Sequence, residues 1–279
     1  MSLRRLQMQQ DPLSVEVFAQ EVKVALRDLQ VVPQVELMLQ ASEVARYGSQ
    51  GYTYHDGYLL LQLTDGTQGY AWTGNDEVDV PRCSPFIGQA SDQIDFAAVP
   101  DYFLVALIDA LAPACFGVPR PYRTVVLAGN TRDKSRARAE CLRNLLPITA
   151  TTRVGILGAM EDVIRAVGES TDDVRIADLA CPGDTVSGRS VESEFLEILS
   201  WCDAAIVTGN TLKTHTLEEV SAVIRDREIP AVAYCITGHN LLPAVMDRLP
   251  FWFVTTEDFP FYWYSGVSSL RIFRQDQTG

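Results

Sequence analysis

Short apolar runs alternate with segments of helical period through the C-terminal half of the chain. The pattern predicts strands at 153–158, 174–178, 204–208, 231–236 and 252–256, with a possible edge strand at 268–273. It predicts helices at 161–167, 191–202, 216–227 and 241–249. Such alternation is typical of a parallel sheet whose neighbouring strands are joined by right-handed crossover helices. The sequence therefore predicts a small doubly wound α/β sheet from residue 151 onward.

The N-terminal half is less regular. Apolar residues at helical spacing predict an opening helix over 13–29, and the run 35–47 is ambiguous. Strand-like runs at 58–63 and 68–72 flank the segment Thr64-Asp65-Gly66-Thr67, in which Asp-Gly favours the positive φ angles of a tight hairpin turn. Residues 75–93 have the composition of a long loop. We therefore expect a hairpin joined to helices.

The segment before residue 150 adds a helix over 103–111 that ends near Pro113, a short strand at 124–129 and a charged amphipathic helix over 133–146. The basic residues of that last helix are expected on a solvated face; they are Lys134, Arg136, Arg138 and Arg143. Because the pattern changes near residue 150, we predict two domains. Residues 1–150 form an α+β domain, and residues 151–279 form a Rossmann-like ligand-binding domain.

Charge and composition exclude several classes of partner. The 279 residues contain 23 Lys and Arg against 36 Asp and Glu, a net charge of −13, which disfavours nucleic acid and an anionic membrane surface. Apolar runs are too short to span a bilayer, and the first residues do not resemble a secretory signal, so we expect a cytoplasmic protein. The six cysteines form no C-x-x-C pair, and we expect them to be reduced.

Polar segments follow the predicted strands, where open α/β sheets bind ligands. Gly155 and Gly158 flank the first turn, with Met160 beyond it, but Leu157 stands where a dinucleotide fingerprint has its middle glycine. Asp178 lies 20 residues after Gly158, the spacing of a ribose-binding acid. A cap on the turn that follows is an equally open role for Asp178.

The third predicted strand is followed by the most polar stretch of the chain. Its candidate ligand-binding residues are Thr208, Gly209, Asn210, Thr211, Thr214 and His215. Thr216 with Glu219 matches a capping box at the start of the next helix. After the fourth strand come Thr237, Gly238 and His239, and a histidine can move a proton or bind a metal at neutral pH.

Metal binding is one interpretation of these segments. Imidazole and thiolate suit soft or borderline metals, and the candidate ligands are Cys181, Cys235, His215 and His239. Their dispersed spacing gives no independent support for a metal site and favours buried thiols and two polar histidines. The aromatic run 259–264 is open to three interpretations: a lid over the site, a subunit contact, or packing between the domains.

The strand-end segments resemble a known family. The segment 208–217, Thr-Gly-Asn-Thr-Leu-Lys-Thr-His-Thr-Leu, is similar to the T-G-[ST]-[AT]-[LF]-x-N-x-T-[LIF] stretch of bacterial and archaeal proteins of unknown function whose Rossmann-like half is labelled a heavy-metal chelation domain. Gly155 to Gly158 resembles the opening turn of that domain, and Ile236 to His239 resembles its V-G-P-[ST]-x-P segment, with Thr214 and His239 replacing the family's asparagine and proline. The resemblance implies an enolase-N-terminal-like α+β domain in front and a ligand crevice facing it.

These observations lead to a hypothesis with two alternatives. We expect a homodimeric protein that binds a small molecule or a metal, with heavy-metal chelation as the family's implied role. One alternative is an enzyme of small-molecule biosynthesis with an adenosine-containing cofactor held by Asp178, in which His215 or His239 moves a proton. The other is an interaction protein that uses the aromatic run. No local motif identifies the ligand or the cofactor.

Overall fold

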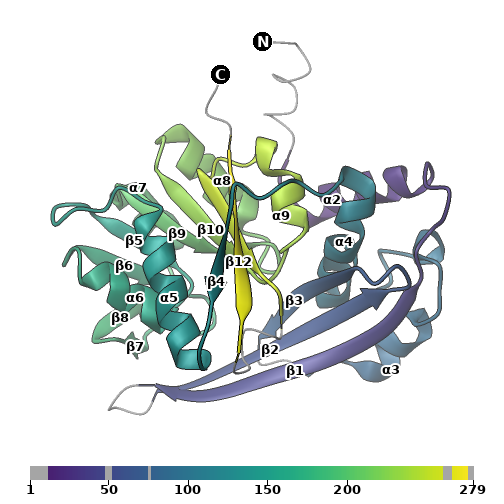
Figure 1. Cartoon of the computed structure of the whole chain (residues 1–279), viewed down its shortest axis with the longest axis horizontal. Helices are drawn as coiled ribbons and strands as arrows, with labels where there is room; N and C mark the ends of the chain where they lie inside the picture. The colour runs from purple at the N-terminus through teal and green to yellow at the C-terminus, as the bar shows by residue number, and fades with distance from the viewer. Residues whose placement is uncertain (1–11, 48–51, 75–76, 260–265, 276–279) are drawn as a thin grey trace, which may run out of the picture.

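The computed structural model describes residues 12–47, 52–74, 77–259 and 266–275. Two sheets organise this part of the chain (Figure 1). The smaller sheet has the order β1-β2-β3, and the larger has the order β4-β12-β11-β10-β9-β5-β6-β8-β7. The predicted α/β class with a Rossmann-like parallel sheet is confirmed.

The predicted strands of the C-terminal half form the centre of the larger sheet. They are β5 (Val154–Leu157), β6 (Val174–Ala177), β9 (Ala204–Thr208), β10 (Ala231–Cys235) and β11 (Phe253–Glu257). These five strands are parallel, in the order β6-β5-β9-β10-β11. That is the 2-1-3-4-5 order of flavodoxin-like sheets, which reverses direction between the first and third strands. Antiparallel strands β12 (Ser268–Arg274) and β4 (Arg123–Leu127) extend one edge.

Helices cover both faces of this sheet. The apolar sides of α5 (Thr131–Asn144) and α6 (Glu161–Gly168) are buried in the hydrophobic cluster on one face. The other face is covered by α7 (Phe195–Trp201), α8 (Leu217–Asp226) and α9 (Leu241–Ala244). Two 3₁₀ turns, η3 (Gly209–Thr211) and η4 (Met246–Arg248), lie between these elements. The layers are those expected for crossover connections.

The predicted helix over 191–202 begins later than expected. Its first residues form β8 (Arg189–Glu192), which pairs with β6 and, through a tight turn, with β7 (Thr185–Val186). Ser187 and Gly188 have positive φ angles of 50° and 77°, as a two-residue hairpin turn requires. Only four residues long, β8 carries too little alternation to show in the sequence pattern.

The smaller sheet is a meander of β1 (Val35–Tyr47), β2 (Tyr52–Leu63) and β3 (Gln68–Gly74). The predicted hairpin is confirmed: Gly66 has a φ of 84°, and its N–H donates to the Leu63 carbonyl at 2.8 Å. Helices α2 (Val15–Leu26) and α4 (Asp101–Phe116) pack together beside it. The predicted loop 75–93 contains three short turns, α3 (Val80–Cys83), η1 (Ser84–Phe86) and η2 (Ser91–Gln93).

Helix α4 continues past Pro113, where the sequence predicted its end. A proline inside a helix has no N–H for the carbonyl four residues earlier, which is that of Asp109. Here the side-chain amide of Asn240 donates to the Asp109 carbonyl at 3.3 Å. The helix therefore survives because another part of the chain supplies the missing donor.

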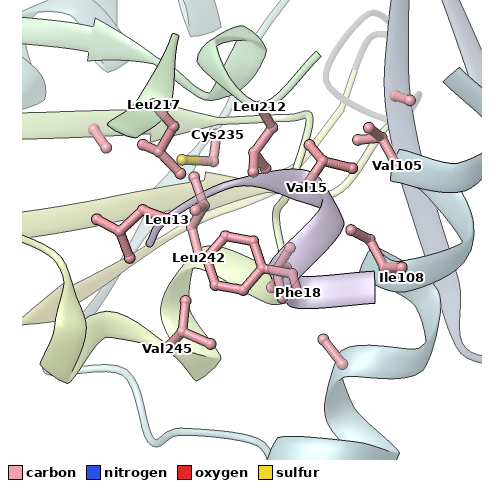
Figure 2. Close-up of a cluster of buried hydrophobic side chains, with 14 of the residues drawn as sticks. Leu13, Val15, Phe18, Val105, Ile108, Leu212, Leu217, Cys235, Leu242 and Val245 are labelled. Carbon is pink, nitrogen blue, oxygen red and sulfur yellow. The ribbon is translucent and has the colours of Figure 1, made fainter. Parts of the chain in front are cut away.

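Both halves of the chain contribute to one hydrophobic cluster (Figure 2). Leu13 and Phe18 at the N-terminal side lie against Leu242 and Val245, and α4 adds Val105 and Ile108. Strand β4 and helix α5, which precede residue 150, belong to the larger sheet and its covering layer. The division into domains near residue 150 stays a prediction, and the chain enters the larger sheet at Arg123.

The basic face of α5 is not solvated as predicted. Lys134 is fully buried and Arg138 is 7% exposed, whereas Arg136 is exposed. The Arg138 guanidinium pairs with the buried carboxylate of Glu257 on β11 at 2.6 Å. A charge can be buried at acceptable cost only when it is paired, and Glu257 provides that pairing.

Candidate functional site

The carboxyl ends of β5 and β9 lie next to each other, at the point where the strand order reverses. Gly158 follows β5 with a φ of 108°, and a Cβ built on it would lie 2.4 Å from Cγ2 of Thr208 at the end of β9. Only glycine permits this backbone conformation and this approach. Ligands of open α/β sheets bind at such reversal points, so the contact between Gly158 and Thr208 locates the candidate site.

Asp178, after β6, is held by backbone N–H groups. Its Oδ2 accepts from Ala159 and its Oδ1 from Ala180, each at 2.8 Å. These bonds match the capping role left open by the sequence and join the ends of β5 and β6. The ribose-binding role stays a prediction.

The electrostatics of this end of the sheet disfavour a phosphate. Helix α6 begins just after Gly158, and its first turn carries Glu161 and Asp162. The N-terminus of such a helix binds a pyrophosphate through its free N–H groups and its positive dipole end. Glu161 is paired with Arg165 at 2.6 Å, and Asp162 adds a second carboxylate, so the turn offsets the dipole and disfavours an anion.

A short hydrogen-bond chain joins the ends of β9 and β10 to the smaller sheet. The Trp72 N–H on β3 donates to Oγ1 of Thr237 at 2.9 Å, and that hydroxyl donates to Oδ1 of Asn210 at 2.9 Å. Gly209 makes the approach possible, because a Cβ there would lie 2.1 Å from the Thr237 carbonyl oxygen. Thr237 is buried and Asn210 is half-buried, so the chain runs from the core to the partly open strand ends.

His239 is buried beside an acid from the N-terminal half. Its Nδ1 lies 2.8 Å from Oδ2 of Asp109 on α4, and the residue is only 6% exposed. Its ring stacks at a tilt on Tyr70, with 4.4 Å between centroids. Nε2 of His239 makes no hydrogen bond within the described residues.

Asp109 accepts from four N–H groups and makes this corner rigid. Oδ2 accepts from the backbone of Tyr70 at 3.0 Å as well as from His239, and Oδ1 accepts from the backbones of Asn240 and Leu241, each at 2.9 Å. One carboxylate therefore ties together β3, α4 and the turn before α9.

Tyr70 and Phe259 close this corner from the side of the smaller sheet. The Tyr70 hydroxyl donates to Oε1 of Gln68 at 2.7 Å, and burial raises the pKa of Tyr70 well above its ordinary value. Phe259 packs on Tyr58 and Tyr70, with 4.7 and 5.6 Å between ring centroids. This contact is packing between the two sheets; the remainder of the aromatic run, 260–264, lies outside the described residues.

His215 is placed elsewhere. Its Nε2 lies 2.8 Å from Asp101 and its Nδ1 lies 3.5 Å from Glu16, so the ring contacts α4 and α2. Asp101 and Asp109 are eight residues apart on α4, about 12 Å along the axis at 1.5 Å per residue. The histidine is 41% exposed in its side chain and has a strained positive φ of 56°. His215 and His239 therefore belong to different surroundings.

Other predicted residues have local structural roles. The Thr211 hydroxyl donates to the Thr208 carbonyl and the Thr214 hydroxyl to the Asn210 carbonyl. Gly155 lies inside β5, where a Cβ would meet Ile198 at 2.9 Å. The predicted capping box at Thr216 is wrong, because its hydroxyl pairs with that of Thr214 at 2.9 Å and caps no helix N–H.

The structure brings together part of the predicted set, which we call the strand-end site. It consists of Gly158, Asp178, Thr208, Gly209, Asn210, Thr237, Gly238 and His239. Met160 borders it, packing against the hydrophobic cluster of α5 and α6. Gly155, Thr211, Thr214 and His215 contribute to folding around it.

The proposed metal ligands do not converge. Cys235 is buried among apolar side chains (Figure 2), and that burial raises its pKa well above the ordinary thiol value. A protonated thiol is a poor metal ligand. Cys181 packs with the opposite cluster, and no group of three His, Cys, Asp or Glu placed to hold a metal exists among the described residues. The set Cys181, Cys235, His215 and His239 therefore does not fit a heavy-metal site.

Sequence reasoning missed the contribution of the N-terminal half. Asp109, Tyr70 and Trp72 reach the strand-end site only because the two sheets meet there. For Asp109 a signal existed: it is the one charged residue in the apolar stretch 102–119. A lone acid in such a helix costs stability unless it has buried partners.

Comparison with known proteins supports the fold. Residues 141–232 match the DUF364 family model. DUF364 is described as "Putative heavy-metal chelation", and the matched stretch contains Gly158, Asp178 and the polar turn after β9. The predicted resemblance is confirmed over this stretch. No curated protein matches the chain in sequence.

Two crystal structures of DUF364 proteins of unknown function extend the likeness to nearly the whole chain. The protein from Desulfitobacterium hafniense DCB-2 is 11% identical with a TM-score of 0.56, covering 92% of this chain and 98% of its own. The protein from Pyrococcus horikoshii is 12% identical with a TM-score of 0.55, covering 93% and 99%. At these identities the likeness shows the fold alone.

Proposed function

We propose that this protein binds a small polar ligand at the strand-end site. The observation that carries the proposal is the contact of Gly158 with Thr208 at the reversal point of the sheet, continued by the hydrogen-bonded residues Asn210 and Thr237. Glycine backbone, hydroxyl and amide groups are the means by which such sites orient polar ligands.

The ligand is expected to lack a phosphate group. Glu161 and Asp162 lie in the first turn of the helix whose N-terminus would bind a phosphate, and both oxygens of Asp178 already accept backbone N–H groups. The same features argue against the alternative of an adenosine-containing cofactor bound through its pyrophosphate and ribose.

The DUF364 description supports a metal-binding role in coarse terms. Because the four predicted ligands do not converge, we propose that a metal would enter already chelated by the small ligand.

The test is a thermal-shift screen of the full chain. The panel contains amino acids, hydroxy acids, sugars, nucleosides and nucleotides, each with and without Zn²⁺, Ni²⁺ or Cu²⁺. A ligand at 100 times its Kd stabilises a fold by about 2.7 kcal/mol. We expect a hit for the wild type that Asn210→Ala abolishes and His215→Gln retains. If every stabilising compound acts equally on all three proteins, the proposal is wrong.

Assembly and location stay predictions. A homodimer is expected from the family resemblance, and light scattering coupled to gel filtration would measure the mass in solution. No helix in the described part of the chain is long and apolar enough to cross a membrane.

A further inference from the structure

His239 and Asp109 form a buried hydrogen-bonded pair in which one ring nitrogen of the histidine stays unbonded. Nδ1 of the imidazole bonds to Asp109, whereas Nε2 has no hydrogen bond within the described residues although the residue is 94% buried. Nε2 is not one of the fully buried side-chain atoms that lack a hydrogen bond, so it is open to solvent. A histidine with one ring nitrogen held by a carboxylate and the other open to solvent is arranged to exchange a proton with a ligand.

We propose that Nε2 of His239 accepts a proton from the bound ligand, with Asp109 as its positioning residue. This inference rests on the proposed function and defines the class of ligand: a small molecule with an acidic O–H, N–H or S–H group. In the step, the X–H bond of the ligand breaks, its proton forms a bond to Nε2, and the electron pair stays on X. The imidazolium that results lies beside the Asp109 carboxylate, so no further reactant is needed.

The hydrogen-bond directions determine which nitrogen is free. Backbone N–H groups can only donate, and those of Tyr70, Asn240 and Leu241 bond to both oxygens of Asp109. Both oxygens are therefore acceptors, so Nδ1 of His239 must donate its hydrogen to Oδ2. In the neutral ring this leaves the lone pair on Nε2.

The surroundings hold the ring in this orientation. Tyr70 stacks at a tilt on the imidazole, and the backbone N–H groups of Asn240 and Leu241 bond to Asp109. The Asn240 side-chain amide adds bonds to the carbonyls of Gln68 at 2.7 Å and Asp109 at 3.3 Å. A general base acts efficiently when it is positioned in advance in this way.

The experiment needs no ligand, so it can fail independently of the thermal-shift screen. The full chain has three histidines, and ¹⁵N-detected imidazole spectra with single His→Gln variants assign them. We expect neutral His239 to carry its hydrogen on Nδ1. Diethyl pyrocarbonate, followed by peptide mass mapping, then reports whether Nε2 is reachable: we expect His239 to react within about tenfold of the rate of the more exposed His215.

Asp109→Asn separates positioning from simple packing. We expect the variant to lose the Nδ1–H preference and to react at least tenfold more slowly at His239, while Asp101→Asn leaves His239 unchanged. If Asp109→Asn does not fold, the wild-type measurements still decide. An Nε2–H tautomer in the wild type, or a His239 that stays unmodified while His215 reacts, overturns the proposal.

Discussion

Arg138 and Glu257 form an ion pair almost completely withdrawn from water, with side-chain exposures of 8% and 0%. The residues are 119 positions apart, on α5 and β11, so the pair anchors a helix to the larger sheet. Ser268 on β12 also donates to Glu257, and burial lowers the pKa of Lys134 in the same helix. The charged residues of α5, which the sequence predicts on a solvated face, therefore hold the helix on the sheet.

Glu257→Gln should therefore be strongly destabilising. It leaves Arg138 buried without its counter-charge, and breaking a buried pair on one side costs about 3–5 kcal/mol. Urea denaturation gives the free energy of unfolding. The matched control is Glu161→Gln, which removes a partly exposed i,i+4 pair with Arg165 and should cost no more than about 0.5 kcal/mol. Equal losses in the two variants would contradict a structural role for the buried pair.

Asp109→Ala should lower the free energy of unfolding by about 3–5 kcal/mol. The substitution removes the acceptor of several buried N–H groups, and each buried donor left without a partner costs about 1–3 kcal/mol. The comparison variant is Asp101→Ala on the same helix, whose carboxylate contacts Lys213 and His215 at a half-exposed site. We expect that variant to lose at most about 1 kcal/mol. The account of the corner fails if Asp109→Ala is as stable as Asp101→Ala.

Gly69→Ala should push β3 away from α4. A Cβ at this position would lie 2.1 Å from the Ala106 carbonyl oxygen and 2.3 Å from the Ala110 nitrogen, both backbone atoms that cannot move alone. Overpacking of this kind costs about 1–3 kcal/mol. Gly168→Ala at the end of α6 meets only the Arg189 side chain at 3.6 Å and should be neutral or stabilising by up to about 1 kcal/mol. A thermal melt that ranks the two variants in the opposite order would disprove the close contact.

Stability should fall above pH 8.5. Burial raises the pKa of Cys202 to about 11 and that of Cys235 well above its ordinary value, so both thiols keep their protons in the folded chain while the unfolded chain releases them near pH 8.5. The unfolded state then binds fewer protons, and the free energy of unfolding decreases with pH.

Urea denaturation under reducing conditions, repeated from pH 7.5 to 10, measures how steeply the free energy of unfolding falls with pH. Cys202→Ala should make this fall shallower, whereas Val220→Ala, another buried truncation, should lower stability equally at every pH. Identical slopes for Cys202→Ala and the wild type would show that the thiol does not titrate as its burial requires.

Pattern alone predicts the parallel centre of the fold because short, mostly apolar strands alternate with amphipathic helices along this half of the chain. It fails where an element is short, as at β8, or where tertiary contacts decide, as at Pro113, whose helix continues because Asn240 supplies a donor. Local preference also failed at Thr216, where the neighbouring hydroxyl of Thr214 competes for the capping side chain.

The candidate site was predictable only from one side. Strand ends reveal Gly158, Thr208, Thr237 and His239, since ligands bind there in open α/β sheets. The acid that orients His239 lies 130 residues away, and its position follows from how the two sheets meet. The sequence also could not show that His239 and His215 lie in different surroundings, because each follows a parallel strand. Only the fold distinguishes them.

The measurement that tests the central claim most directly is native mass spectrometry of the full chain. The chain is first incubated with the small-molecule fraction of a cell extract and then exchanged into a volatile buffer. We predict one adduct of small mass on the wild type and on His215→Gln, and its loss from Asn210→Ala. Elemental analysis of the same samples shows whether a metal accompanies it. An adduct retained equally by all three proteins would contradict binding at the strand-end site.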